Sequence, residues 1–330
     1  MTAADPRLAA LGWRPFFAEQ LTPGEAAAAQ PVRVMAIHRG KIAIAGADGD
    51  ALVAPDLPRS DDAEDQPAAG DWLLLDRATH KPRRLLRRAS LFKRRAPGSG
   101  RRLQLIAANV DTLFVVAACH QDFNLARIER YLVLAREVAV RPVVVLTKAD
   151  LVESPHRLAD AARDLQPGLA VAVVDARDAA GVAALAGWCG PGQTVALLGS
   201  SGVGKSTLIN TLRGSDRLAT QPVRGGDGKG RHTTTAREMH RLEGGGWLLD
   251  TPGMRELQLS DAAAGLDELF DDVVALARDC RFSNCGHRGE PDCAVQAALR
   301  AGTLDPARLA RWRKLGAEDA LNSRSLAERR

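Results

Sequence analysis

The sequence predicts a multidomain protein in which a small β-barrel precedes a central α/β domain, with a helical module at the C-terminus. Three observations predict this fold class. Short β-rich runs fill much of the first hundred residues, apolar strands alternate with helical segments from Asn109 onward, and cysteines and a histidine cluster near residue 285. Alternating strands and helices are typical of a parallel sheet covered on both faces. We expect an N-terminal extension over 1–30, the barrel over 31–100, the α/β domain over 101–260 and the C-terminal module over 261–330.

Length and composition set the broad class. The 330 residues are enough for two or three domains, each with its own core. Hydrophobic residues make up 45% and charged residues 26%, which is ordinary for a soluble globular protein and excludes a mainly disordered chain. No apolar run approaches the roughly twenty residues that cross a bilayer, and the start lacks the features of a secretory signal. We therefore expect a cytoplasmic monomer with reduced thiols and no membrane partner.

The N-terminal part combines a short opening with a β-rich region. Residues 1–30 begin with an amphipathic stretch and continue into a Pro-Gly-Ala-rich link, to which we assign no chemistry. Beyond it, about five short strands indicate a small barrel. An oligonucleotide-binding (OB-like) barrel is one candidate because it pairs this strand count with basic surfaces, although any small all-β module gives a similar pattern. We expect these strands at Val32–Ile37, Lys41–Ala45, Ala51–Ala54, Trp72–Asp76 and near Leu85–Phe92.

The formal net charge is +5, and the excess is unevenly spread. A dense basic run falls within twenty residues: Arg83, Arg84, Arg87, Arg88, Lys93, Arg94, Arg95, Arg101 and Arg102. Such a run is either a solvated face or a surface for nucleic-acid phosphates. Together with the motifs below, we favour an RNA-phosphate surface.

A phosphate-binding loop (P-loop) lies at the centre of the α/β region. It follows the apolar run Thr194–Leu198 and precedes a helical pattern that begins at Thr207. Glycines let backbone N–H groups turn onto a β-phosphate, and the following helix directs its positive dipole end to the same place. Lys205 then reaches the β- and γ-phosphates, and Ser206 offers a hydroxyl to Mg²⁺. The candidate nucleotide-binding residues here are Gly199, Ser200, Ser201, Gly202, Val203, Gly204, Lys205, Ser206 and Thr207. The alternative is an ordinary glycine-rich turn, which needs no Lys-Ser pair.

An earlier strand, Pro142–Leu146, ends in Thr147-Lys148-Ala149-Asp150, which looks like the base-reading corner of a GTPase. The Asp150 carboxylate can accept bonds from N1–H and the 2-amino group of guanine, and adenine offers neither. Lys148 would lie along the base. Thr147 replaces the usual Asn, so one polar contact to the base or to the phosphate loop is expected to be weaker. The alternative is a solvated strand end.

The next strand, Ala170–Val174, ends at Asp175-Ala176. A GTPase usually carries Ser-Ala here, and a backbone N–H of this pair contacts the guanine oxygen. Because that contact involves the main chain, Asp175 in place of Ser does not forbid it.

Two further segments look like the switches of a GTPase. The glycine-dense run Gly225–Thr235 ends in threonines, and we favour Thr234 for Mg²⁺; the alternative is a merely flexible loop. A later strand ends in Asp250-Thr251-Pro252-Gly253, where Asp250 would hold Mg²⁺ through water and the N–H of Gly253 would contact the γ-phosphate. In most GTPases these parts precede the base-reading corner, whereas here the corner comes first. The motif order is therefore circularly permuted.

The C-terminal region carries Cys280, Cys285, His287 and Cys293 within fourteen residues. Three thiolates and one imidazole suit a closed tetrahedral site for one structural Zn²⁺ ion. Disulfides are the alternative, which the expected reducing compartment disfavours. Cys119 and Cys189 lie in or beside apolar runs and are expected to be buried packing residues.

The permuted motif order, the β-rich N-terminal module and the Cys/His cluster together resemble the RsgA (YjeQ) family of bacterial small ribosomal subunit biogenesis GTPases. The resemblance covers nearly the whole chain, from Val32 to about residue 315. It implies an OB-like barrel, a circularly permuted P-loop GTPase domain and a zinc-binding module. It also implies a role in late maturation of the 30S subunit, with 16S rRNA as a partner and GTP hydrolysis stimulated by that subunit.

The expected reaction, hydrolysis of GTP to GDP, depends on positioning and charge stabilisation by Lys205, Mg²⁺ and the loop N–H groups. Ras-like GTPases use a Gln after Asp-x-x-Gly to orient the attacking water, but this chain has Met254. We therefore expect slow intrinsic turnover, with His232 as the nearby candidate for the missing group; the alternative is a loop histidine without catalytic duty. One rival function is a nucleotide-dependent RNA-binding scaffold whose hydrolysis is incidental. An ATPase remains possible only if Asp150 does not face the base.

Overall fold

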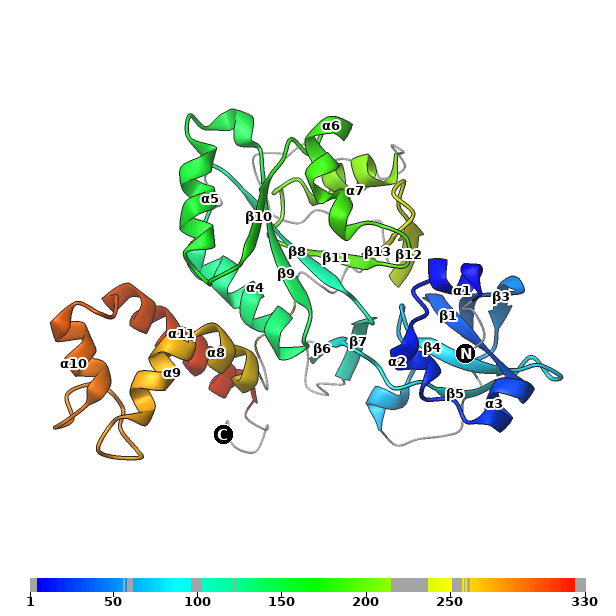
Figure 1. Ribbon diagram of the computed structural model, residues 1–330, viewed down its shortest axis with the longest axis horizontal. Coiled ribbons are helices and arrows are strands. Elements are labelled where there is room, and N and C mark those ends of the chain that lie inside the picture. Colours follow the sequence, from blue (N-terminus) through cyan, green and yellow to red (C-terminus); the bar gives the residue numbers. More distant parts are fainter. Residues whose placement is uncertain are drawn as a thin grey trace. The chain divides into compact units, whose positions relative to one another are not determined.

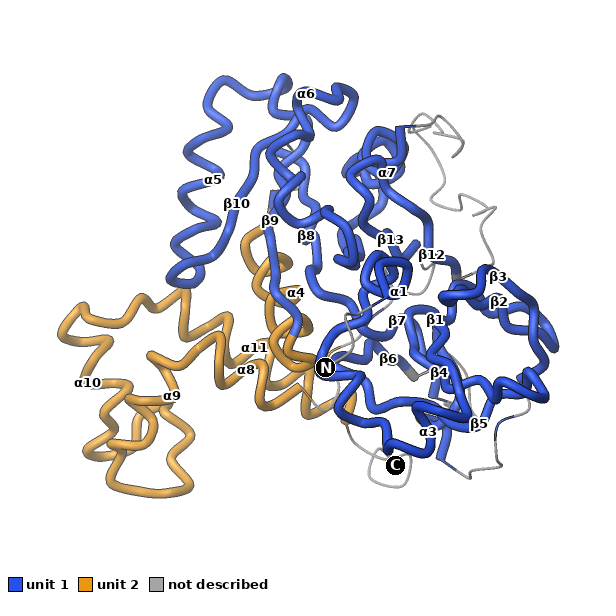
Figure 2. The backbone as a smooth tube through the Cα atoms, turned by 45° about the vertical axis from the view of Figure 1, so that its right-hand side comes forward, with its two compact units in different colours: residues 1–123, 140–257 blue, residues 124–139, 258–330 orange. Residues whose placement is uncertain are grey.

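The computed structural model describes residues 5–55, 57, 62–95, 103–120, 123–214, 237–250, 257, 259 and 262–323. The chain divides into two compact units, 1–123 with 140–257 and 124–139 with 258–330 (Figure 2). The four-part division expected from the sequence stays a prediction. Each unit is described by itself below.

Three short helices open the first unit: α1 (Pro6–Ala10), α2 (Pro15–Ala18) and α3 (Pro23–Ala28). Each begins with proline, whose fixed φ suits the first helical position and whose missing N–H costs nothing there. Apolar residues of this opening pack around Trp72, which is fully buried, and the ring of Trp13 lies edge-on to it at 4.8 Å. The N-terminal extension is therefore part of the hydrophobic core of this unit.

Antiparallel strands follow, mostly where the alternation predicted them: β1 (Ala29–His38), β2 (Lys41–Gly46), β3 (Gly49–Val53), β4 (Trp72–Asp76) and β5 (Pro82–Leu85). β1 pairs with both β2 and β4, and the short 3-10 helix Ala63–Asp65 lies between β3 and β4. A separate two-stranded sheet contains β6 (Leu91–Arg95) and β7 (Leu103–Ala108). The strand expected near Leu85–Phe92 is thus the end of β5 and the start of β6. An OB-like barrel stays a prediction.

The central sheet has the parallel order β10-β9-β8-β11-β13 (Figure 1). Its strands are β8 (Thr112–Ala118), β9 (Arg141–Thr147), β10 (Ala170–Val173), β11 (Thr194–Leu198) and β13 (Trp247–Asp250). The chain runs outward from β8 to β10 and then returns to the other side of β8. The strand order therefore reverses between β8 and β11, where open parallel sheets bind ligands at their carboxyl ends.

β12 (Arg237–Arg241) runs antiparallel between β13 and β1, so the N-terminal strands and the parallel strands belong to one sheet. One face of the parallel part packs against apolar residues of three helices: α6 (Ala179–Val182), the 3-10 helix Ala183–Trp188 and α7 (Lys205–Arg213). α5 (Pro155–Arg163) connects β9 to β10 (Figure 1).

Arg33 ties the N-terminal opening to this sheet. Its side chain is 2% exposed and donates to the carbonyls of Leu11 and Gly70 and to Oγ1 of Thr194, the last at 2.8 Å. Burial lowers the pKa of Arg33 to about 10. A buried cation on β1 therefore joins the opening, the turn before β4 and the start of β11.

The second unit is helical and includes a helix from the middle of the chain (Figure 2). Its helices are α4 (Leu125–Glu137), α8 (Ala263–Leu269), α9 (Asp271–Arg278), α10 (Ala294–Ala301) and α11 (Pro306–Ser323). Glu129 of α4 is fully buried, and its carboxylate lies 2.7 Å from Nε of Arg311 and 3.8 Å from Nη1 of Arg308. Among the residues described, no helix combines the length and the apolar character that crossing a membrane requires.

Candidate functional site

The phosphate loop connects β11 to α7 at the point where the strand order reverses. Gly204, with φ of 95°, adopts the left-handed conformation just before α7. A Cβ at Gly199 would lie 2.2 Å from the carbonyl oxygen of Val116 on β8, so a side chain cannot be accommodated there. The glycines at both ends of the loop are thus required by backbone geometry, as a phosphate-binding loop demands. The helix begins at Lys205, two residues before the sequence pattern placed it.

Lys205 lies inside its own loop. It is 6% exposed, and its ammonium group donates to the carbonyls of Gly199, at 2.6 Å, and of Ser200. The charge is thereby held within the curve of the loop, at the N-terminus of α7. A cation at this position and the helix dipole both favour a bound phosphate.

Thr147 connects the predicted base-reading corner to the phosphate loop. It is fully buried at the end of β9, and its Oγ1 donates to the carbonyl of Val203 at 2.5 Å. A Cβ at Gly204 would lie 3.5 Å from Oγ1 of Thr147. Because Thr replaces Asn, the sequence predicts a weaker contact to the base or to the phosphate loop, and the structure has a contact from Thr147 to the loop.

The corner itself turns sharply. Lys148 has φ of 54°, and a 3-10 turn over Ala149–Leu151 follows it. The side chain of Asp150 is 45% exposed, and its Oδ2 lies 3.2 Å from Nη2 of Arg177. The strand pairing of β9 with β10 brings Asp150 and Asp175 to one edge of the sheet.

Asp175 holds the same arginine more tightly. Its carboxylate accepts from Nε and Nη2 of Arg177, both at 3.0 Å, and from the backbone N–H of Arg177 at 3.0 Å. The side-chain hydrogen bond from Arg177, followed by the backbone one, lowers the pKa of Asp175 below its ordinary value. Next to it, the carbonyl of Ala176 accepts from Oγ1 of Thr211 on α7 at 2.6 Å. Both base-side corners are therefore bonded to the P-loop or to its helix.

Asp250 ends β13 on the same carboxyl edge of the parallel strands. Ser206 and Thr207 lie in the first turn of α7. Three predicted residues, Thr234, His232 and Gly253, lie outside the described residues. Within the part of the chain that the structure describes, the predicted nucleotide residues therefore come from the ends of β9, β10, β11 and β13 and from the first turn of α7.

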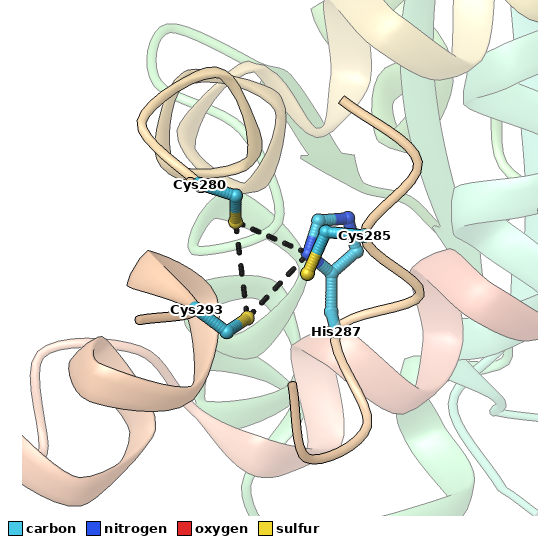
Figure 3. Close-up of side chains that lie close together, drawn as sticks. All are labelled: Cys280, Cys285, His287 and Cys293. Carbon is cyan, nitrogen blue, oxygen red and sulfur yellow. Dashed lines mark hydrogen bonds between the residues drawn. The ribbon is translucent and has the colours of Figure 1, made fainter. Parts of the chain in front are cut away.

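The four metal-ligand candidates also come together (Figure 3). The ligand atoms of Cys280, Cys285, His287 and Cys293 all lie within 4.8 Å of one another. Sγ of Cys280 is 3.8 Å from Sγ of Cys293, and Nδ1 of His287 is 3.4 Å from the first sulfur and 3.7 Å from the second. A tetrahedral ion with metal–sulfur bonds of about 2.3 Å and metal–nitrogen bonds of about 2.0 Å needs sulfur–sulfur edges of about 3.8 Å and sulfur–nitrogen edges of about 3.5 Å. The donor set and its spacing fit a metal ion.

The surroundings support this geometry. Burial raises the pKa of the Cys280 thiol, but hydrogen bonds from the backbone N–H groups of Val295 and Ala294 and from the neighbouring cysteine side chains together outweigh it, so the pKa lies below its ordinary value. These N–H groups belong to the first turn of α10. The carbonyl of His287 accepts from the side chains of Gln296 and Arg313, which fixes the loop that carries the imidazole. The described cysteines form no disulfide.

The basic run is in part structural. Arg84 binds Glu25 at 2.6 Å, and Arg88 binds the fully buried Asp71 at 2.8 Å. Two more of its members also form ion pairs, Arg83 with Asp76 and Lys93 with Glu64. Among the described residues of the run, these four cations are therefore compensated within the fold, whereas Arg101 and Arg102 lie outside the described residues.

Sequence reasoning missed Arg177. The sequence did contain a signal for it. Asp175 replaces the Ser that GTPases usually carry at this position, and a cation that could pair with the new carboxylate follows two residues later. Only the pairing of β9 with β10 reveals that the same guanidinium also reaches Asp150.

The chain is similar in sequence to a described protein family and to several known proteins. A model of the family described as RsgA GTPase matches residues 85–260. The chain is 50% identical over 328 residues to "Small ribosomal subunit biogenesis GTPase RsgA" of Mesorhizobium japonicum, covering 98% of this chain and 93% of that protein. It is 48% identical to "Small ribosomal subunit biogenesis GTPase RsgA 2" of Vibrio parahaemolyticus, covering 97% and 88% of the two chains.

Two solved structures share the fold. YjeQ from Thermotoga maritima superposes with a TM-score of 0.64 at 22% identity, covering 87% of this chain and 97% of that one. YloQ, described as a circularly permuted GTPase, gives a TM-score of 0.63 at 21% identity, covering 90% and 97%. The permuted order that the sequence predicted is thus a property of the fold.

Proposed function

Because the chain belongs to the RsgA GTPase family, we propose that it hydrolyses GTP and acts in the maturation of the small ribosomal subunit. GTP, GDP and the 30S subunit are then its partners. The names of the matching relatives support this function, and the combination of a P-loop with a corner that can read guanine supports the substrate.

One contact carries the substrate proposal. The hydroxyl of Thr147 bonds to the carbonyl of Val203, so the corner that would read the base is attached directly to the loop that would bind the phosphates. One nucleotide can then contact the corner with its base and the loop with its phosphates. In this assignment Asp150 accepts from N1–H and the 2-amino group of guanine, Lys148 lies along the base, and a backbone N–H of the Asp175-Ala176 pair contacts the guanine oxygen.

The phosphate end follows the chemistry of P-loop proteins. Lys205 and the loop N–H groups stabilise charge on the β- and γ-phosphates. Mg²⁺, when bound, neutralises charge that develops between these phosphates. Its proposed protein partners are Ser206, Thr234 and Asp250, and the N–H of Gly253 is assigned to the γ-phosphate.

We assign His232 to orienting the attacking water, because the thioether of Met254 has no proton to donate and is only a weak acceptor. The test is a single-turnover measurement on His232→Ala with and without small subunits. An unchanged stimulated rate rejects this role.

We assign one structural Zn²⁺ to the Cys/His cluster. Three thiolates and one imidazole with no open position match the structural sites of this ion. The test is the metal content of the purified chain, which should be one zinc per molecule, and Cys293→Ser should lower it. Retention of one zinc by a variant that lacks two of the four ligands contradicts the assignment.

The exposed part of the basic run, together with α11, is assigned to 16S rRNA phosphates. A monomeric, cytoplasmic protein fits this role. If phosphate contacts dominate, the affinity for the subunit falls steeply as salt rises.

The decisive experiment is a turnover assay with 30S, 50S and no ribosomal subunit. We expect slow hydrolysis by the protein without subunits and stimulation by 30S only. Equal rates in all three conditions would contradict the proposal that the 30S subunit is the partner. A nonhydrolysable GTP analogue should trap the complex with 30S. Unchanged release would instead support the scaffold function, in which hydrolysis is incidental.

A further inference from the structure

We propose that Arg177 is a positioning residue for guanine selection, which holds the Asp150 carboxylate in place while Asp175 anchors the arginine. The inference rests on the proposed function, since it assumes that Asp150 reads the base. It adds to that function a residue outside the base-reading motifs, and it gives Asp175 a role for its side chain.

The geometry shows a chain of contacts from one strand end to the next. The carboxylate of Asp175 accepts hydrogen bonds from Nε and Nη2 of Arg177, both at 3.0 Å. The backbone N–H of Arg177 donates to the same carboxylate. The guanidinium is therefore fixed in orientation. Its Nη2 then lies 3.2 Å from Oδ2 of Asp150.

Charge explains why a cation is needed between these two residues. A carboxylate at position 175 places a second negative charge beside the one that must read guanine, and like charges on adjacent strand ends repel each other. The guanidinium of Arg177 contacts both and offsets this repulsion. A lysine cannot replace it fully, because the planar fork of arginine can hold one carboxylate at two points and still contact another.

The contact is compatible with base reading. An ionised carboxylate has two oxygens with about four acceptor positions, and the arginine uses one of them on Asp150. The remaining positions can accept N1–H and the 2-amino group of guanine. The arginine thus restricts the rotation of the carboxylate without consuming its capacity to accept.

The corner that carries Arg177 is itself well supported. Asp178 caps the following helix by accepting from the N–H groups of Ala180 and Gly181. A Cβ at Gly181 would lie 2.8 Å from the carbonyl of Asp175, so the helix packs closely on the corner. The backbone that presents the arginine is therefore fixed.

The test compares Arg177→Ala and Arg177→Lys with the wild type in equilibrium binding of GDP and IDP. IDP lacks the 2-amino group of guanine. The ratio of the affinities for GDP and IDP therefore reports how well the Asp150 carboxylate is positioned to accept from that group. We expect Arg177→Ala to weaken GDP binding about fivefold. We also expect the preference for GDP over IDP to fall, and Arg177→Lys to restore part of both.

Arg163→Ala provides the matched control. Arg163 forms an exposed ion pair with Asp160 on α5 in the same unit, at 2.6 Å, and removing it should leave both affinities unchanged. In the double variant Asp175→Ala/Arg177→Ala, the repulsion is also removed, so GDP binding should recover relative to Arg177→Ala.

The outcomes separate this inference from the proposed function. If Arg177→Ala keeps the GDP-to-IDP preference of the wild type, Arg177 does not position Asp150. If the variant binds GDP more tightly, the arginine competes with the base, and the inference is also rejected. A wild-type protein that binds ADP as well as GDP, with no effect of Asp150→Ala, would instead reject the proposed function.

Discussion

The buried hydroxyl of Thr147 joins the proposed base-reading corner to the phosphate loop. Thr147→Val keeps the shape of the side chain but leaves the carbonyl of Val203 without this donor. We expect the free energy of unfolding to fall by about 1 kcal/mol. GDP binding should weaken as well, because the phosphate loop loses an attachment. Urea unfolding and GDP titration measure the two effects.

Thr147→Ser is the control for this prediction, because it retains the hydroxyl. It should bind GDP more tightly than Thr147→Val. Equal GDP affinities for the valine variant and the wild type would show that the bond does not contribute to the site.

The side chain of Glu25 makes a pH-dependent contribution to the stability of the fold. The hydrogen bond from the side chain of Arg84, followed by the one from the backbone N–H of Thr22, lowers the pKa of Glu25 from 4.5 to about 2. Because the folded pKa is the lower one, the stabilisation is present above pH 4.5 and is lost as the pH falls toward 2. The stability advantage of the wild type over Glu25→Gln should therefore shrink between neutral pH and a pH of about 3. Urea midpoints at both values measure it, and a constant difference would contradict the prediction.

Among the structural elements, α4 and α8 pack closely at a glycine, so a substitution can test their contact. A Cβ at Gly265 of α8 would lie 2.4 Å from the carbonyl of Val133 and 2.7 Å from the amide nitrogen of Glu137, both on α4. Backbone atoms cannot move aside as a flexible side chain can. We expect Gly265→Ala to force the helices apart and to destabilise the second unit by about 1–3 kcal/mol, measured by thermal unfolding.

Gly316→Ala is the matched substitution in the same unit. Its Cβ would meet only Cδ2 of Leu266 at 3.5 Å, an ordinary contact. Since alanine favours a helix interior over glycine, this variant should be stabilised by up to about 1 kcal/mol. Opposite signs for the two variants are the expected result, and equal effects would argue against the steric explanation.

The same helices mark the limit of what the sequence could predict. β4 was expected at Trp72–Asp76 and lies there, because an apolar run with turn signals on both sides determines a strand locally. Helices were also expected to alternate with the strands of the α/β domain, as α4 does along the chain, but the packing partners of α4 were not predicted. Its neighbours in sequence are β8 and β9, whereas Glu129 binds Arg308 and Arg311, almost two hundred residues later. Local patterns carry no information about such contacts.

At the scale of the whole molecule, the candidate site was predictable because its logic is topological. The carboxyl ends of parallel strands meet at one edge, so motifs that follow four separate strands come together regardless of their order in the chain. The metal cluster was predictable for a simpler reason, since its four ligands lie within one short segment. The proposed role of Arg177 was not predictable, because it depends on which strands are neighbours and not on a motif.

The division of the chain into two units, 1–123 with 140–257 and 124–139 with 258–330, leads to a last prediction. The proposed nucleotide residues lie in the first unit and the metal ligands in the second. A ligand that binds only the folded state stabilises the unit that holds it, by about 2.7 kcal/mol at a concentration of one hundred dissociation constants. Differential scanning calorimetry should therefore show two transitions, of which GDP raises one and a zinc chelator lowers the other.

Cys293→Ser assigns the transitions, because it should reproduce the effect of the chelator and abolish any further effect of adding it. Lys205→Ala should likewise remove the response to GDP while leaving the response to the chelator intact. If GDP and the chelator each shift both transitions by the same amount, the chain unfolds as one cooperative body. The two compact units would then not be independent in stability, even though each has its own set of ligands.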